Sequence, residues 1–372
     1  MEAGTSLATG GVLRFTAIAI PSASTVAITG AEGIADGGIS GSGTLVVDPG
    51  AGATYTMSKN NTGFTGEAVV KSGVVKFGDY QSFGPIGRSG FIRVKGGAVL
   101  DENAQTYYPS SGKSLSKAVL EKDAELRSNP GYGQVQYSVL TTINLEGNAT
   151  VDTSYGNVSL SERWNDHAVY LNLGTNTLTV IGNKVFGISY CTISGTGTID
   201  IQDGATVEST HDYDNVSVST TCANGTIRIR EGGRWHLATY YNRVSRLSVR
   251  NLVLDGSVTR GASSYTLTVT GSITGNGTTP MLTLGPGAVF KPTGTGYLHV
   301  AEELSGTVKI DMGDLAGKSR VPLLKVPAAL KATADGAIDR ASIPRGWYLT
   351  VKENDGDAYY DLIRTEFSVI IR

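Results

Sequence analysis

Residues 193–207 read ISGTGTIDIQDGATV and contain the two sequence elements that decide the fold. The first element, Ile193 to Ile201, is a glycine-rich corner followed by a strand pattern. In the second, from Ile201 to Val207, a strand ends, polar residues and glycine turn the chain, and a small residue precedes another strand. Alternating apolar and small polar residues are typical of strands with one buried face. The stretch therefore predicts short strands that are joined by corners.

Both elements recur along the chain, at irregular intervals. The first recurs at 39–47 (ISGSGTLVV), 222–229 (CANGTIRI), 273–284 (ITGNGTTPMLTL) and 305–310 (SGTVKI). The second recurs at 47–55 (VDPGAGATY), 94–100 (VKGGAVL), 120–126 (LEKDAEL), 145–151 (LEGNATV), 229–235 (IREGGRW) and 284–290 (LGPGAVF). A unit that cannot bury its own apolar face must stack on its neighbours, so the recurrence predicts a solenoid with loops of variable length.

Short strands with corners suit a chain that winds as a parallel coil, each turn pairing with the turns above and below. Val, Ile and Leu then stack in a common interior, while Thr, Ser and Asn face outward. Glycine is needed where a corner takes a positive φ or a neighbouring coil comes close. A β-sandwich or propeller would require more tight hairpins. The Asn-Gly pair at 224–225 and the Asp-Gly pair at 255–256 lie instead between dissimilar strands, so we predict an all-β parallel β-solenoid.

Helical periodicity is almost absent from the chain. The one exception is residues 113–127 (KSLSKAVLEKDAELR), which fit a surface helix but also contain the second repeat element. We favour two strands for this segment, because the corner pattern of the repeat continues through it.

Composition excludes several classes of protein. With 31 Lys and Arg against 33 Asp and Glu, the net charge is −2, so no polycationic face is expected and nucleic-acid binding is not predicted. Charged residues make up 17% of the chain, below the roughly 25% of ordinary globular proteins. Glycine accounts for 49 of 372 residues, and the hydrophobic content of 40% argues against disorder.

Cysteine and histidine usage predicts no metal site and no cofactor. Cys191 and Cys222 are too few for a disulfide framework or a zinc site. A bridge between them stays open, although two buried thiols are the simpler expectation. The four histidines are scattered and form no His-x-x-x-His array. No apolar run reaches about 18 residues, so no membrane-spanning segment is predicted in this chain.

The C-terminal part differs in composition from the repeats. Pro, Lys and Asp become more frequent after Leu304, and residues 346–363 read as an antiparallel hairpin with a turn at Asn354-Asp355-Gly356. We therefore divide the chain into a parallel β-helix over residues 1–304 and a C-terminal capping segment over residues 305–372. A cap is expected because a solenoid otherwise leaves an open strand edge at its end.

Residues 39–104 carry an ordered set of short motifs. They are Gly43-Thr44-Leu45, Asn61-Thr62-Gly63-Phe64-Thr65-Gly66, Gly73-Val74-Val75, Gly84-Pro85-Ile86-Gly87 and Gly97-Ala98-Val99-Leu100-Asp101. Their order and spacing resemble the autotransporter-associated β-strand repeat of bacterial passenger domains. Later repeats resemble it more loosely.

The resemblance implies a right-handed parallel β-helix that is exported through the outer membrane, to the bacterial cell surface or the extracellular space. Such passengers usually precede an outer-membrane β-barrel. This chain departs from that plan because it ends at Arg372 without a series of alternating strands of about ten residues. We expect that the barrel is not part of this chain, or that export takes another route.

Some parallel β-helices degrade polysaccharides, so catalysis is the alternative function. Glycoside hydrolysis needs two carboxylates about 5 to 10 Å apart. Asp212 and Asp214 would share a face of an extended segment, next to His211. These three are the candidate catalytic residues of a glycoside hydrolase or lyase, although a solvated polar loop explains them more simply. No serine-protease nucleophile motif and no polygalacturonase pattern is present.

Aromatic residues supply the candidate ligand-binding positions. The chain has 17 Tyr and 8 Phe, and several Tyr occur in adjacent pairs. Because neighbouring residues of a strand face opposite ways, one ring of each pair should point outward. Tyr240, Tyr241, Trp164 and Trp235 lie beside charged residues or histidine and suit stacking on sugars or docking of a protein. Rings that cover corners of the solenoid are the simpler alternative for about half of them.

The sequence thus favours a non-catalytic, exported bacterial surface protein, an adhesin or scaffold whose partners are glycans or host or surface proteins. The ligand and the oligomeric state do not follow from the sequence, because a fold can carry many functions.

Overall fold

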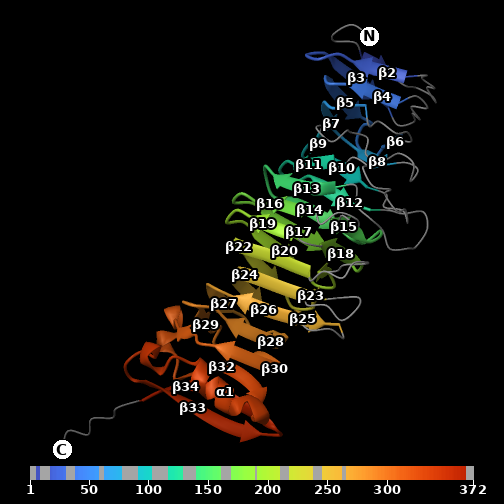
Figure 1. Cartoon of the computed structure of the whole chain (residues 1–372). Coiled ribbons are helices and arrows are strands. Elements are labelled where there is room, and N and C mark those ends of the chain that lie inside the picture. The colour runs from blue at the N-terminus through green and yellow to red at the C-terminus, as the bar shows by residue number, and fades with distance from the viewer. Residues whose placement is uncertain are drawn as a thin grey trace, which may run out of the picture.

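The structure, a computed structural model, describes twelve segments of the chain. They are residues 6–8, 17–30, 38–57, 63–77, 91–102, 116–128, 140–160, 169–188, 191–209, 218–237, 245–261 and 265–365. The described chain is 62% strand and 6% helix and forms a parallel β-solenoid of about 10 turns. Figure 1 shows the coils stacked in one direction, from the N-terminal strands to a C-terminal cap. The predicted fold class is therefore confirmed.

Each coil passes through up to three sheet faces. The first face contains β1 (Ser6–Ala8), β3 (Thr25–Thr29), β5 (Thr44–Asp48), β7 (Glu67–Val70), β9 (Phe91–Val94), β11 (Ser116–Leu120), β13 (Leu140–Leu145), β16 (Val169–Asn172), β19 (Cys191–Ser194) and β26 (Tyr265–Val269). The second contains β6 (Thr54–Met57), β8 (Val74–Phe77), β10 (Val99–Asp101), β12 (Glu125–Arg127), β14 (Ala149–Asp152), β17 (Thr177–Ile181), β20 (Thr198–Ile201), β27 (Ser272–Thr274), β29 (Val289–Lys291) and β31 (Lys309–Ile310).

The third face connects the second back to the first. It contains β15 (Val158–Leu160), β18 (Val185–Ile188), β21 (Thr206–Ser209), β23 (Arg234–Leu237) and β25 (Ser257–Arg260), and near the N-terminus β2 (Ala17–Ile20) pairs separately with β4 (Gly38–Gly41). Four longer strands bend from one face into the next. These are β22 (Val218–Ile229), β24 (Ser245–Leu254), β28 (Thr278–Leu284) and β30 (Leu298–Gly306).

The register is parallel from coil to coil, and partners are about 20 to 30 residues apart in the chain. On the second face one inward column is apolar through nine coils. It runs through Tyr55, Val75, Leu100, Leu126, Val151, Val180, Ile201, Ile229 and Leu254, all of them buried. A slip of one residue would turn such a column to solvent, so the alternation in the sequence specifies the register.

Outward columns are polar, as predicted. One column of the first face contains a hydroxyl in six successive coils, at Thr192, Thr221, Ser248, Thr268, Thr283 and Ser305. In a neighbouring column Asn172 Nδ2 donates to Asn144 Oδ1 and Ser194 Oγ donates to Asn172 Oδ1. Polar side chains of one column therefore form hydrogen bonds with each other from coil to coil. These bonds satisfy polar groups that are half-buried and have little access to water.

Two glycines of the deciding stretch illustrate different needs for glycine. Both take a left-handed conformation, with φ of 90° at Gly195 and 75° at Gly204. A Cβ at Gly195 would lie 2.4 Å from the carbonyl oxygen of Gly174 in the preceding coil, whereas at Gly204 the nearest atom would be 3.7 Å away. Gly195 is thus required both by its backbone angle and by contact between coils, and Gly204 by its angle alone.

Residues 116–128 form β11 and β12 with a corner between them, so strands rather than a helix occupy this segment. Ala118 and Leu120 face the core from β11, and Ala124 and Leu126 do so from the corner and β12. The corner of the second repeat element, which continues through this segment, therefore indicated strands correctly.

Both cysteines are buried and free. In the register Ile193 lies opposite Cys222, so Cys191 is displaced from Cys222 by one strand and two residues. Strand spacing and rise then place their Cα atoms about 8 Å apart, beyond the roughly 7 Å that a disulfide can span. Burial raises the pKa of Cys191 to about 12 and that of Cys222 to about 11, so both thiols stay protonated near neutral pH.

We expect both cysteines to remain thiols in protein purified without reductant. A chromogenic thiol reagent should titrate two thiols per chain after denaturation, and it should react only very slowly with the folded protein, because the thiolate is the reactive form. A loss of free thiols in the denatured, unreduced chain would contradict the register of β19 and β22.

The C-terminal cap changes the pairing from parallel to antiparallel. Strand β32 (Arg320–Pro327) pairs in parallel with β30 and antiparallel with β34 (Asp357–Arg364), which also pairs with β33 (Trp347–Asn354). Asp355 and Gly356 have φ of 51° and 82°, as a two-residue turn between twisted strands requires. The predicted hairpin is confirmed. The boundary expected between residues 304 and 305 falls inside β30.

The only α-helix among the described residues, α1 (Lys331–Ala337), lies in the cap, together with three 3-10 turns at Gly313–Gly317, Ala328–Leu330 and Arg340–Ser342. No helix in the described segments is long and apolar enough to cross a membrane.

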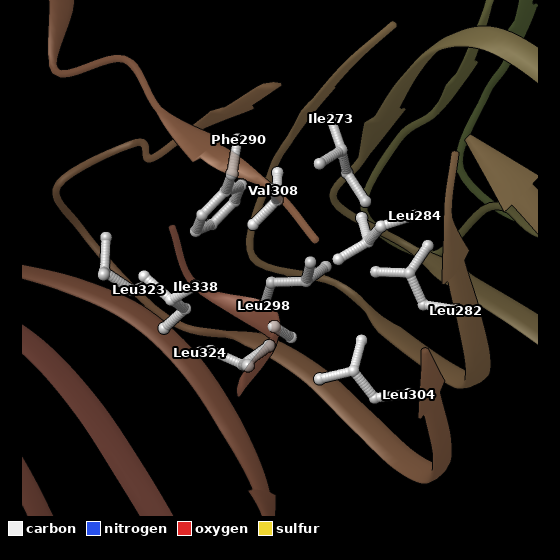
Figure 2. Close-up of a pocket in the computed structure, with 11 residues that line it drawn as sticks. Ile273, Leu282, Leu284, Phe290, Leu298, Leu304, Val308, Leu323, Leu324 and Ile338 are labelled. Atoms are coloured by element: carbon white, nitrogen blue, oxygen red, sulfur yellow. The ribbon is translucent and has the colours of Figure 1, made fainter. Parts of the chain in front are cut away.

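The cap and the last coils share one apolar core. Figure 2 shows side chains from both converging on a small cavity of about 20 Å³. The lining residues are Ile273, Leu282, Leu284, Phe290, Leu298, Leu304 and Val308 from the coils, and Leu323, Leu324, Ala337 and Ile338 from the cap. A cavity of this size and chemistry has no polar group to hold even a single water. We therefore interpret it as a packing defect under the cap and not as a ligand site.

Candidate functional site

Most of the residues that the sequence singled out lie outside the described segments. This applies to the candidate catalytic residues His211, Asp212 and Asp214, and to Tyr240, Tyr241 and Trp164. The strands that bound these positions are described, however. Each of the three segments follows a strand of the third face (β15, β21 or β23) and precedes a strand of the first face (β16, β22 or β24). The register stacks these strand ends along one corner of the solenoid.

Trp235 is a core residue and offers no ring to a surface ligand. Its side chain is fully buried, on an inward column between Val207 and Val258 of the neighbouring coils. The indole N–H donates to Ser209 Oγ at 3.0 Å, which satisfies the polar group of a buried Trp. This corrects the expectation of an exposed ring at this position. Trp235 and Leu237 are two residues apart, so their shared inward face was the available sequence signal.

Among the described residues, tyrosine rings are exposed at three separate places. Tyr155 lies between β14 and β15, with the Arg127 guanidinium 4.6 Å from its ring centroid, while Tyr170 is on β16 and Tyr348 on β33. At the adjacent pair Tyr359-Tyr360, Tyr360 is buried and Tyr359 is only half-buried. The expectation that one ring of such a pair faces outward is confirmed at this pair.

The outward side of the sheet β30-β32-β34-β33 brings polar and aromatic residues together, and we call it the cap face. It consists of Tyr297, His299, Arg320, Lys325, Tyr348, Thr350, Lys352, Asp357, Tyr359 and Asp361. In the register His299 is opposite Lys325, Lys325 is opposite Tyr359, and Tyr359 is opposite Lys352. The adjacent residues Leu324, Val351 and Tyr360 pack in the core, so these four side chains form one outward row across four strands.

A carboxylate that is almost completely buried organises one end of the cap face. Asp361, whose side chain is 1% exposed, accepts hydrogen bonds from Tyr297 Oη at 3.0 Å and from Arg320 Nη2 at 2.9 Å. Arg320 also donates to Tyr297 Oη at 2.7 Å. The rings of Tyr297 and Tyr359 meet edge to face, with centroids 5.3 Å apart. Asp361 thus positions Tyr297, and Tyr297 supports the ring of Tyr359.

The basic residues of the row differ in what compensates their charge. Lys325 Nζ lies 2.9 Å from Asp357 Oδ2 and 5.4 Å from the Tyr359 ring centroid, and the hydrogen bond to Asp357 raises the pKa of Lys325. Lys352 is exposed and has no hydrogen-bond or ion-pair partner among the described residues. Burial, followed by the charge of Lys325, lowers the pKa of His299, which Asp357 opposes. His299 is therefore neutral at pH 7.

The arrangement suits binding better than catalysis. Both carboxylates of the cap face are paired with cations, Asp357 with Lys325 and Asp361 with Arg320. Each carboxylate is thus occupied by a cation of the protein, whereas glycoside hydrolysis needs two carboxyl groups that contact the substrate. No cluster of three or more metal-ligating side chains occurs in the described part of the chain. The partly buried ring of Tyr359 and the ammonium group of Lys352, which has no carboxylate partner, can instead contact an anionic ligand.

Sequence reasoning identified the Tyr359-Tyr360 pair but missed the rest of the cap face. Its members come from four strands and are separated by up to several dozen residues, so no local pattern unites them. Comparison with known proteins adds no further guide, because no protein-family model, no curated protein and no solved structure matches the chain.

Proposed function

We propose that the protein is a non-catalytic, exported bacterial surface protein, a passenger-type β-solenoid that acts in adhesion or as a scaffold. The observation that carries the proposal is the way the family-like motifs of residues 39–104 map onto the coils. Gly43-Thr44-Leu45 enters β5, Gly66 precedes β7, Gly73 precedes β8, and residues 97–101 enter and form β10. The motif residues that lie in the described segments thus coincide with corners and strands of successive parallel coils, whereas residues 61–62 and 84–87 lie outside those segments.

The chemistry of the described surface also supports a passive role. Outward columns contain Thr, Ser and Asn that bond to one another, and the carboxylates of the cap face are ion-paired. A stiff solenoid with such a surface displays loops and faces at a distance from its point of attachment, as adhesins and scaffolds require.

Localisation is the first test of this proposal. In the bacterium that carries the gene, an epitope tag inserted in the corner 122–123 should be labelled by antibody on intact cells, and protease added to intact cells should remove the protein. A tag in the same chain that becomes accessible only after lysis would contradict export.

Activity is the second test. Purified chain incubated with a panel of neutral and acidic polysaccharides should release no reducing ends and no unsaturated products. Turnover that Asp212→Ala abolishes would instead establish the polysaccharide-degrading alternative. Glu231→Ala, which changes a carboxylate at a different corner, is the matched control.

A further inference from the structure

One row of side chains on the cap face places an aromatic ring between basic groups. His299, Lys325, Tyr359 and Lys352 lie side by side across β30, β32, β34 and β33. Neighbouring strands are about 4.8 Å apart, so the row is about 14 Å long. It therefore presents a ring in the middle of a line of basic groups and is long enough to contact several units of a polymer.

Charge on this face is uneven. Within the row Lys325 is paired with Asp357, which leaves Lys352 as the lysine without a carboxylate partner. Arg320, beside the row, is paired with Asp361, but its side chain is 54% exposed and adds positive charge to the same face. His299 sits at the other end of the row and faces Lys325 of β32 and Asp357 of β34, while Thr278, its register partner on β28, is uncharged. Protonation of His299 would add a second unpaired cation to the row.

Hydrogen-bonding groups lie one step along the strands from this row. Thr350 is opposite Asp361 in the register, and Tyr297 contacts Asp361 from β30's leading end. The hydroxyls of Thr350 and Tyr297 therefore lie on one side of the row, next to Asp361. Thr350 Oγ1 donates to the Asp361 carbonyl oxygen at 3.4 Å and Tyr297 Oη donates to Asp361 Oδ1 at 3.0 Å, so each hydroxyl oxygen is left to accept a hydrogen bond. A ring that can stack, ammonium groups and hydroxyls at this spacing complement a sugar ring that bears a carboxylate.

From these contacts we infer that the cap face is a binding site for carboxylated polysaccharides. The ammonium group of Lys352 pairs with a sugar carboxylate, Tyr359 stacks on the ring, and the hydroxyl oxygens of Thr350 and Tyr297 accept hydrogen bonds from sugar hydroxyls. A neutral glycan would leave Lys352 without a role, and a nucleic acid would require many more phosphate contacts than this face offers. The inference deepens the proposed adhesive function and rests on it for its biological role, although binding itself can be measured on the purified chain.

Polygalacturonate is the probe for the first experiment, with its methyl ester and dextran as uncharged comparisons. By titration calorimetry at pH 7.5 and low salt, the folded chain should bind polygalacturonate, bind the methyl ester much more weakly, and not bind dextran. Affinity should fall as salt is added, because the ion pair is screened. Equal binding of dextran, or no binding of polygalacturonate, would overturn the inference.

Variants then locate the binding site. Lys352→Glu should weaken polygalacturonate binding by about tenfold or more, since an attractive charged contact becomes repulsive, while Lys352→Arg should retain it. Lys117→Glu is the matched control, because Lys117 is an exposed lysine of β11 on the first face and the substitution makes the same change in net charge. Equal losses in Lys352→Glu and Lys117→Glu would show binding to overall charge and would contradict the site.

Two further experiments test whether the site prefers a sugar to other anions and whether His299 takes part in binding. Poly-glutamate should bind more weakly than polygalacturonate, because it offers no ring to Tyr359, and equal affinity would overturn the assignment to sugars. Binding of polygalacturonate should strengthen as the pH is lowered through the depressed pKa of His299 and its imidazole gains a proton, and His299→Gln should abolish that increase. If polygalacturonate does not bind but intact cells still display the protein, the cap site fails and the proposed function stands.

Discussion

Replacing Trp235 by alanine is expected to lower the free energy of unfolding by about 3 to 5 kcal/mol, the usual cost of removing a large buried aromatic side chain. Trp235 has no exposed surface and fills the interior of its coil between Val207 and Val258. Truncation removes this contact area and leaves a cavity that a regular stack of strands can close only by moving whole coils. Urea denaturation followed by circular dichroism measures the loss.

Two variants show whether packing accounts for the loss. Trp235→Phe keeps most of the ring but removes the hydrogen bond to Ser209, so it should cost clearly less than the alanine variant. Tyr170→Ala, at an exposed ring on a neighbouring part of the stack, should change the free energy of unfolding by no more than about 0.5 kcal/mol. A Trp235→Ala protein as stable as the Tyr170→Ala protein would show that Trp235 is not in the core.

Substitution of Gly195 by alanine is expected to destabilise the chain by about 2 kcal/mol more than the same substitution at Gly204. Both residues have a positive φ in the same coil, so both variants incur the backbone cost of about 1 kcal/mol or more that a Cβ brings there. Only at Gly195 does the new Cβ also collide with backbone, 2.4 Å from the carbonyl oxygen of Gly174, which forces two coils apart.

Comparison of these two variants isolates the contact between coils from the backbone angle. Each would be compared with the unsubstituted chain by thermal and urea denaturation. Because the coils contact only their neighbours, we expect Gly195→Ala to speed up amide hydrogen exchange first in β16, β17, β19 and β20. Equal destabilisation by the two substitutions would contradict the close approach of the coils at residues 174 and 195.

The fold could be predicted because its rules are local and repeated. Alternation of apolar and polar residues sets the inward columns, as Leu178 and Val180 on either side of Thr179 illustrate on β17. Positive φ requires Gly195 at a corner and the Asp355-Gly356 turn in the cap hairpin. Each of these sequence signals spans only a few residues, and each either recurs along the chain or belongs to a known turn type. The sequence pattern alone was therefore sufficient to predict the fold.

The candidate site could not be predicted in the same way. The row on the cap face depends on the pairing of β30 with β32, and on a register shift between Pro322 and Leu324 in the pairing of β32 with β34. Without that shift Lys325 would not lie opposite Tyr359. Trp235 shows the opposite case, in which the charged and polar neighbours Arg234 and His236 suggested exposure although the alternation with Leu237 already indicated burial.

The placement of connections described above has an evolutionary consequence. The strand ends near residues 160, 209 and 237 lie along one corner of the solenoid, and from each of them the chain returns to the first face. Insertions or deletions in the connections at that corner leave the pairing of the strands unchanged, because no paired position is added or lost. The length and composition of these connections can therefore change, coil by coil, without disturbing the paired strands of the solenoid.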